Sequence, residues 1–94
     1  MHERALMDDV MRKIEEVALA GGATRVTRVG VRLGPLSHFT PQHFGEHFVD
    51  ASRGTLAEGA DVDAVVDDDI AGAHASAVVL ESIEVDVPEP AAAR

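Results

Sequence analysis

The chain has 94 residues, no cysteine, and a formal net charge of −9 from 17 acidic and eight basic residues. A chain of this length forms one domain that buries roughly 60–65% of its unfolded surface, and without cysteine it has neither disulfides nor thiolate metal ligands. The charge disfavours nucleic acid and anionic membrane surfaces as partners, and no segment resembles a membrane span or secretory signal, which predicts a cytoplasmic protein.

The first three residues, Met1-His2-Glu3, have the pattern of a metal chelator. The α-amino group, the amide nitrogen of His2 and its imidazole Nδ1 can form two fused chelate rings, and such nitrogen-rich tetragonal sites suit Ni(II) or Cu(II). Glu3 adds a second amide nitrogen and a carboxylate. The alternative is a chance His-Glu pair after a start codon, which the tripeptide alone does not exclude.

A helix and a strand are predicted next. Apolar residues recur every three or four positions, which predicts an amphipathic helix over about Ala5–Ala20. Gly21 and Gly22 end it, because glycine readily adopts the left-handed conformation common at helix C-termini. From Arg25 to Leu33 the period is two, which is typical of a strand. One face of this strand is expected to carry Thr27, Val29, Val31 and Leu33, and the other Val26, Arg28, Gly30 and Arg32.

A second helix is predicted from about Pro41 to Ser52. Thr40 can cap its first turn, where proline is tolerated. Phe44 and Phe48 lie four residues apart, so both fall on the expected apolar side.

The same helix contains His43-Phe44-Gly45-Glu46-His47, which matches the H-x-x-E-H pattern of a zinc peptidase class. The glycine within the motif, the short chain and the lack of a further carboxylate ligand on a later helix argue against a hydrolase. His43 and His47 are more simply a solvated stripe, and the remaining alternative is an auxiliary metal site formed by His38, His43 and His47. The sequence also lacks a serine nucleophile motif and a phosphate-binding glycine loop, so no enzyme activity is expected.

Two further strands are predicted, around Val62–Val66 and over about Val79–Val87, by the alternation of apolar and polar residues. Residues 67–77 between them are polar and small, which indicates a loop. We expect one domain over residues 1–88 and a flexible tail over residues 89–94. This order predicts an α+β fold, with two helices packed on a small three-stranded mixed sheet whose first two strands are parallel.

Five segments, in order along the chain, are more specific: Met1-His2-Glu3, Arg25–Val29, Leu33–Ser37, Gly54–Ala60 and Leu80–Val85. Together they resemble the HypA/HybF nickel-insertion proteins of hydrogenase maturation. The resemblance implies a nickel metallochaperone that binds Ni(II) through the amine of Met1, the amides of His2 and Glu3 and the His2 imidazole, for insertion into a nickel–iron hydrogenase. It also implies a hydrogenase large subunit and a nickel-handling GTPase as partners.

One departure from this family is clear. Its members carry a zinc module between the second and third strands, held by two CxxC pairs, whereas this chain has only the short stretch around residues 67–77. No zinc is therefore expected, and the two strands that flank the missing module are expected to be neighbours. The departure leaves open a second function, that of an accessory or interaction subunit of a hydrogenase or its maturation complex that transfers no metal. The oligomeric state and service to urease also stay open.

Overall fold

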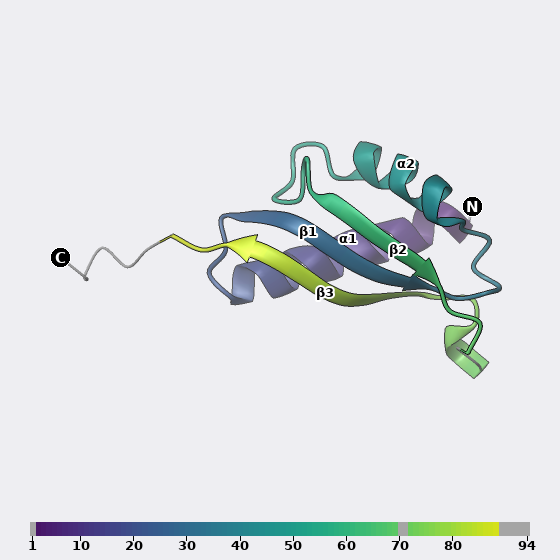
Figure 1. The fold of residues 1–94 in the computed structure, drawn as a ribbon. Coiled ribbons are helices and arrows are strands. Elements are labelled where there is room, and N and C mark those ends of the chain that lie inside the picture. Colours follow the sequence, from purple (N-terminus) through teal and green to yellow (C-terminus); the bar gives the residue numbers. More distant parts are fainter. Residues whose placement is uncertain (1, 70–71, 89–94) are drawn as a thin grey trace.

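The helices and strands follow the predicted order in the computed structural model, which describes residues 2–69 and 72–88 (Figure 1). The elements are α1 (His2–Ala20), β1 (Arg25–Leu33), α2 (Pro41–Ala51), β2 (Asp61–Val66), the short 3₁₀ helix η1 (Gly72–His74) and β3 (Val78–Asp86). Two helices and a three-stranded mixed sheet confirm the predicted fold class. The predicted tail over residues 89–94 lies outside the described residues.

Helix α1 begins at His2, earlier than the predicted Ala5. Glu3 lies in its first turn, where a negative side chain is favourable because the N-terminal end of a helix carries partial positive charge. The helix buries one stripe, which consists of Met7, Val10, Met11, Ile14 and Ala18. On the solvent side Arg12 forms ion pairs with Asp9 and Glu16 within the same helix.

The strand order in the sheet is β2-β1-β3. Strand β1 runs parallel to β2 and antiparallel to β3, as the predicted crossover through the second helix requires. The expectation that β2 and β3 are neighbours is wrong, because β1 lies between them. The connection between β2 and β3 therefore joins the two edges of the sheet, and its described parts, residues 67–69 and 72–77, lie at the end of β1.

The predicted alternation of faces in β1 fails at one residue. Val26 is fully buried, although it was expected on the face opposite Val29. Its partner in β3 is Val85 while the partner of Arg28 is Glu84, so Thr27 is the extra residue of a bulge. A bulge shifts the phase of a strand by one residue, and this shift brings Val26 to the core side.

Helix α2 forms as predicted. The Thr40 hydroxyl accepts a hydrogen bond from the amide of His43 at 3.1 Å, and Pro41 occupies the first helical position. Phe44 and Phe48 are both buried, whereas Val49 is 59% exposed. The capped end fixes where the helix begins, and the two phenylalanine rings fix which side of it faces the core.

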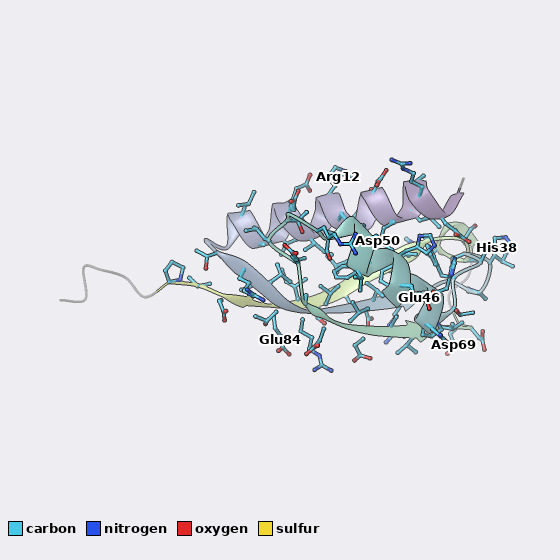
Figure 2. The ribbon with its side chains drawn as sticks, turned by 90° about the horizontal axis from the view of Figure 1, so that it is seen from above. Arg12, His38, Glu46, Asp50, Asp69 and Glu84 are labelled. Atoms are coloured by element: carbon cyan, nitrogen blue, oxygen red, sulfur yellow. The ribbon has the colours of Figure 1, made fainter. Side chains whose placement is uncertain are left out.

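The two helices pack on one face of the sheet, and the other face is polar. Helix α1 packs against β3, α2 packs against β2, and the two helices contact each other. The opposite face of the sheet is polar: Arg28 pairs with Asp63 at 3.7 Å, and Arg32 pairs with both Asp67 and Glu81. In Figure 2, Arg12 lies on the outer side of α1 and Glu84 at the opposite side of the sheet. Among the described residues, no helix is long and apolar enough to span a membrane.

Asp67 joins the end of β2 to this polar face and should make stability depend on pH. The backbone amide of Asp69 donates to its carboxylate at 2.9 Å, and this bond, together with the Arg32 ion pair, holds the pKa of Asp67 below its ordinary value. A carboxyl group with a lowered pKa in the folded state stabilises the fold above its unfolded pKa of about 3.9, and loses that contribution as the pH falls through the folded value. We expect Asp67→Asn to lower the melting temperature near neutral pH but not in strong acid.

Thermal unfolding at both acidities tests this expectation, with Asp68→Asn as the matched control at the neighbouring exposed position. An equal effect of Asp67→Asn at both acidities would contradict it.

Gly34, directly after β1, leaves room for the chain that leads into β3. Its amide donates to Ala77 at 2.9 Å, and the amide of Leu36 donates to Ala75 at 2.7 Å. A methyl group at position 34 would collide with the backbone carbonyl oxygens of His74 and Ala75. We therefore expect Gly34→Ala to lower the free energy of unfolding by about 1–3 kcal/mol, as overpacking does.

Urea denaturation measures this cost. Gly45→Ala is the control, because a methyl group there meets nothing within 4 Å and alanine in a helix is favoured over glycine by about 0.5–1 kcal/mol. A Gly34→Ala variant as stable as the wild type would show that the segment before β3 does not pack on β1 in this way.

Candidate metal centre

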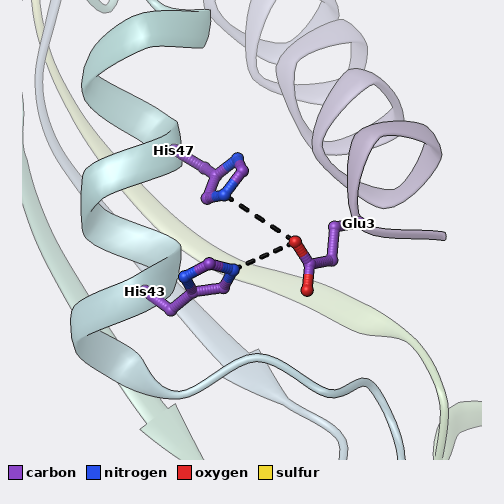
Figure 3. A group of neighbouring side chains, drawn as sticks. All are labelled: Glu3, His43 and His47. Atoms are coloured by element: carbon purple, nitrogen blue, oxygen red, sulfur yellow. Dashed lines mark hydrogen bonds and ion pairs between the residues drawn. The ribbon is translucent and has the colours of Figure 1, made fainter. Parts of the chain in front are cut away.

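Three side chains that can bind a metal converge between the two helices (Figure 3). Glu3 comes from the first turn of α1, and His43 and His47 come from α2. Nε2 of His43 lies 3.0 Å from Oε1 of Glu3, and Nε2 of His47 lies 3.7 Å from the same oxygen. One ligand atom from each residue lies within 4.8 Å of the other two. We call this group the inter-helix cluster.

Local structure explains why both imidazoles face α1. Residues four apart lie on one side of a helix, so His43 and His47 are neighbours, with ring centroids 4.4 Å apart. The adjacent stripe of α2 is anchored in the core by its phenylalanines. The buried ring of Phe39 packs against both imidazoles, with centroid distances of 5.7 Å to His43 and 6.1 Å to His47.

The inter-helix cluster is open to solvent and contains one carboxylate. The side chains of Glu3, His43 and His47 are 35%, 38% and 43% exposed, so ions in solution can reach them. The hydrogen bond with His43, with a smaller contribution from the charge of His47, holds the pKa of the Glu3 carboxyl below its ordinary value. Glu3 is therefore ionised at neutral pH. Two imidazoles and a carboxylate form a donor set that suits Ni, Zn or Cu rather than Mg or Ca.

The predicted amino-terminal site is described only in part. Met1 and the side chain of His2 lie outside the described residues, whereas the backbone of His2 and Glu3 forms the start of α1. The first four amides of a helix have no acceptor within the helix. Metal binding by the amide nitrogens of His2 and Glu3 would therefore break no hydrogen bond of α1.

The predicted auxiliary site stays a prediction, of which the structure brings two residues together, His43 and His47. His38 lies in an exposed loop with φ of 67° and does not belong to the inter-helix cluster; the third ligand candidate is Glu3 instead. His43 and His47 are not simply a solvated stripe, because they face α1. Glu46, which would be the general base of the peptidase motif, does not belong to the cluster either. Sequence spacing could not reveal Glu3, because it approaches the histidines only through tertiary packing.

Comparison with known proteins gives a consistent result. Residues 1–85 match the family model described as HypA, hydrogenase/urease nickel incorporation, metallochaperone. The hydrogenase maturation factor HypA of Methylocella silvestris is 34% identical over 83 residues, which cover 86% of this chain and 74% of that protein. The Methanosarcina mazei factor is 34% identical over 62 residues, or 66% of this chain and 45% of that protein. The chain thus spans about half to three quarters of the length of these relatives.

A similar fold is known. The solution structure of the Ni metallochaperone HypA from Helicobacter pylori matches with a TM-score of 0.76 and 19% sequence identity, and the match covers 94% of this chain and 100% of that one. At this identity the likeness shows a shared fold.

Proposed function

The chain belongs to the HypA family of hydrogenase/urease nickel incorporation metallochaperones, and we propose that it binds one Ni(II) ion at its amino terminus and delivers it to a nickel–iron hydrogenase. The observation that carries this proposal is the family match, which starts at residue 1 and so includes Met1, His2 and Glu3. The family consists of metallochaperones rather than enzymes, in agreement with the prediction that the chain is not an enzyme.

In this proposal four nitrogen atoms bind the ion: the amine of Met1, the amides of His2 and Glu3, and the imidazole of His2. A square-planar set of nitrogen donors suits Ni(II). Two features support it. The amides at the start of α1 need no acceptor within the helix, and the net charge of −9 raises the local concentration of cations.

Release of the ion follows from the same chemistry. All four nitrogens must lose protons or present free lone pairs to bind the metal, so protons compete with nickel for them. A site at a chain terminus can in general also be approached by ligands from an acceptor protein. We propose a hydrogenase large subunit as the acceptor and a nickel-handling GTPase as a second partner, in the cytoplasm.

The second candidate function is an accessory subunit that binds a hydrogenase or its maturation complex without transferring metal. The observation that favours it is the absence of cysteine, because the zinc module of the family lies where this chain has only residues 67–77. This function predicts stable co-purification with a large partner and no effect of His2→Ala on hydrogenase activity.

The two functions can be separated in cells that lack the chain. If the chain delivers nickel, its loss should leave the hydrogenase large subunit without nickel, and excess nickel in the medium should restore the metal content by mass action. The His2→Ala variant should behave as the deletion does. Failure of excess nickel to restore the metal content, together with full activity of His2→Ala, would favour the accessory subunit.

A further inference from the structure

We propose that Glu3, His43 and His47 form a second nickel site, separate from the amino-terminal nitrogens and adjacent to them. Two imidazole nitrogens and one carboxylate oxygen would bind the ion, and water would complete its coordination. This inference rests on the proposed function only for the identity of the ion, since the donor set itself accepts several divalent transition metals.

The distances in the inter-helix cluster are close to those of a metal site. With metal–ligand bonds of about 2.0–2.1 Å, adjacent ligand atoms on a six-coordinate ion lie about 2.8–3.0 Å apart. The separation of 3.0 Å between the Glu3 oxygen and Nε2 of His43 lies at the upper end of this range, and the separation of 3.7 Å to Nε2 of His47 exceeds it. Small side-chain rotations, which the partial exposure of all three residues permits, would place the three atoms around one ion.

A hydrogen bond between helices does not account for the cluster. His43 alone makes that bond with Glu3. His47 directs Nε2 at the same oxygen from 3.7 Å, which is beyond hydrogen-bond distance. Two ring nitrogens from successive helical turns thus lie near one carboxylate oxygen, so a cation placed between the three atoms could bind them all.

The surroundings of the cluster favour a fixed site with access from solvent. Phe39 packs against both imidazoles and restricts their orientation, and such support from outside the ligand set raises metal affinity. A shallow groove beside His47 is lined by Asp8 and Asp50 as well as Arg4. The two carboxylates lower the cost of bringing a cation to the histidines, whereas Arg4 in the lining and Arg53, which pairs with Asp50 at 3.3 Å, oppose them.

Glu3 belongs to both proposed sites, but through different atoms. Its backbone nitrogen belongs to the amino-terminal site, and its side-chain carboxylate belongs to the inter-helix cluster. The two ions would differ in their electronic state. Ni(II) with four nitrogens in a plane is diamagnetic, whereas Ni(II) with two imidazoles, one carboxylate and water is six-coordinate and paramagnetic.

The test uses the full chain with one residue added before Met1, which removes the α-amino group from the terminal chelate but leaves the cluster intact. Ni(II) is titrated by calorimetry and by proton NMR, in which a paramagnetic ion broadens nearby resonances. We expect one equivalent of paramagnetic nickel that broadens the His43 and His47 ring signals. Absence of binding, or broadening elsewhere only, would overturn the proposal.

Substitutions in the extended chain define the ligands. His47→Gln removes one ligand without touching the hydrogen bond between His43 and Glu3, and should weaken binding by at least about tenfold. Glu3→Gln should weaken it similarly, because a neutral amide replaces the carboxylate. His38→Gln is the matched control and should bind as the parent does. Equal affinity in all these proteins, with unchanged circular dichroism, would contradict the assignment.

A last variant separates this inference from the proposed function. His43→Gln combined with His47→Gln, in the chain with a free amino group at Met1, should lose the paramagnetic ion and keep the diamagnetic one. If the wild-type chain, with both histidines and a free amino group at Met1, binds no diamagnetic nickel, that result would count against the proposed function. It would not count against the inter-helix site.

Discussion

One residue added before Met1 should abolish square-planar Ni(II) binding, because it moves the amine away from the two adjacent amides and the imidazole of His2. His2→Ala should do the same, because it removes the imidazole. We expect each change to weaken the square-planar site by more than about 100-fold, since loss of a direct ligand exceeds the roughly 10–100-fold cost of losing an outer-shell partner. The absorption band of square-planar nickel measures this loss.

The fold should survive both changes. Among the described residues, α1 contributes to the buried core from Met7 onward, five residues beyond His2. Circular dichroism and thermal unfolding provide this control, and Arg4→Ala, two residues beyond His2 and exposed, should leave the nickel band unchanged. An undiminished band in the His2→Ala variant would remove the imidazole from the site.

Phe44→Ala should destabilise the protein by about 3–5 kcal/mol, the range observed for loss of a buried aromatic ring. Phe44 is fully buried, and its ring packs edge-on against Phe39 at 5.4 Å and stacks with Phe48 at 6.2 Å. The substitution therefore leaves a cavity among large side chains that hold α2 against the rest of the fold. In a domain of 94 residues this loss is a large part of a total stability of about 5–15 kcal/mol.

Urea denaturation measures the loss in Phe44→Ala. The matched control is Val49→Ala in the same helix, where the side chain is 59% exposed and the expected change is within about 0.5 kcal/mol. Equal destabilisation by the two substitutions would mean that α2 is not anchored through Phe44. Because His43 precedes this ring in the sequence, a loosened α2 should also weaken metal binding by the inter-helix cluster.

Much of the fold could be predicted from the sequence because its signals are local. The change of period from three or four to two marks the passage from α1 to β1, and the start of α2 follows from Thr40 and Pro41. The start of α1 was placed too late because no residue there carries a helix-capping signal. The prediction that Val26 lies on the face opposite Val29 was wrong, because the bulge that shifts it depends on pairing with β3, which the sequence of β1 does not reveal.

The candidate site shows the same division between local and tertiary information. Helical spacing predicted correctly that His43 and His47 are neighbours. Proximity along the chain suggested His38 as their companion, but the loop turns its backbone through a positive φ and the residue lies outside the cluster. Glu3 takes that place only because α1 packs beside α2. The predicted amino-terminal chelator involves residues outside the described part of the chain and stays a prediction.

The central claim, that this chain binds nickel through its amino terminus, is tested most directly by a Ni(II) titration of the protein with a free amino group at Met1. Absorption spectroscopy and proton NMR would be recorded at each addition. We predict one equivalent of diamagnetic, square-planar nickel. Any broadening caused by a paramagnetic ion should be confined to the resonances of His43 and His47. A chain that takes up no diamagnetic nickel at saturation would contradict the account.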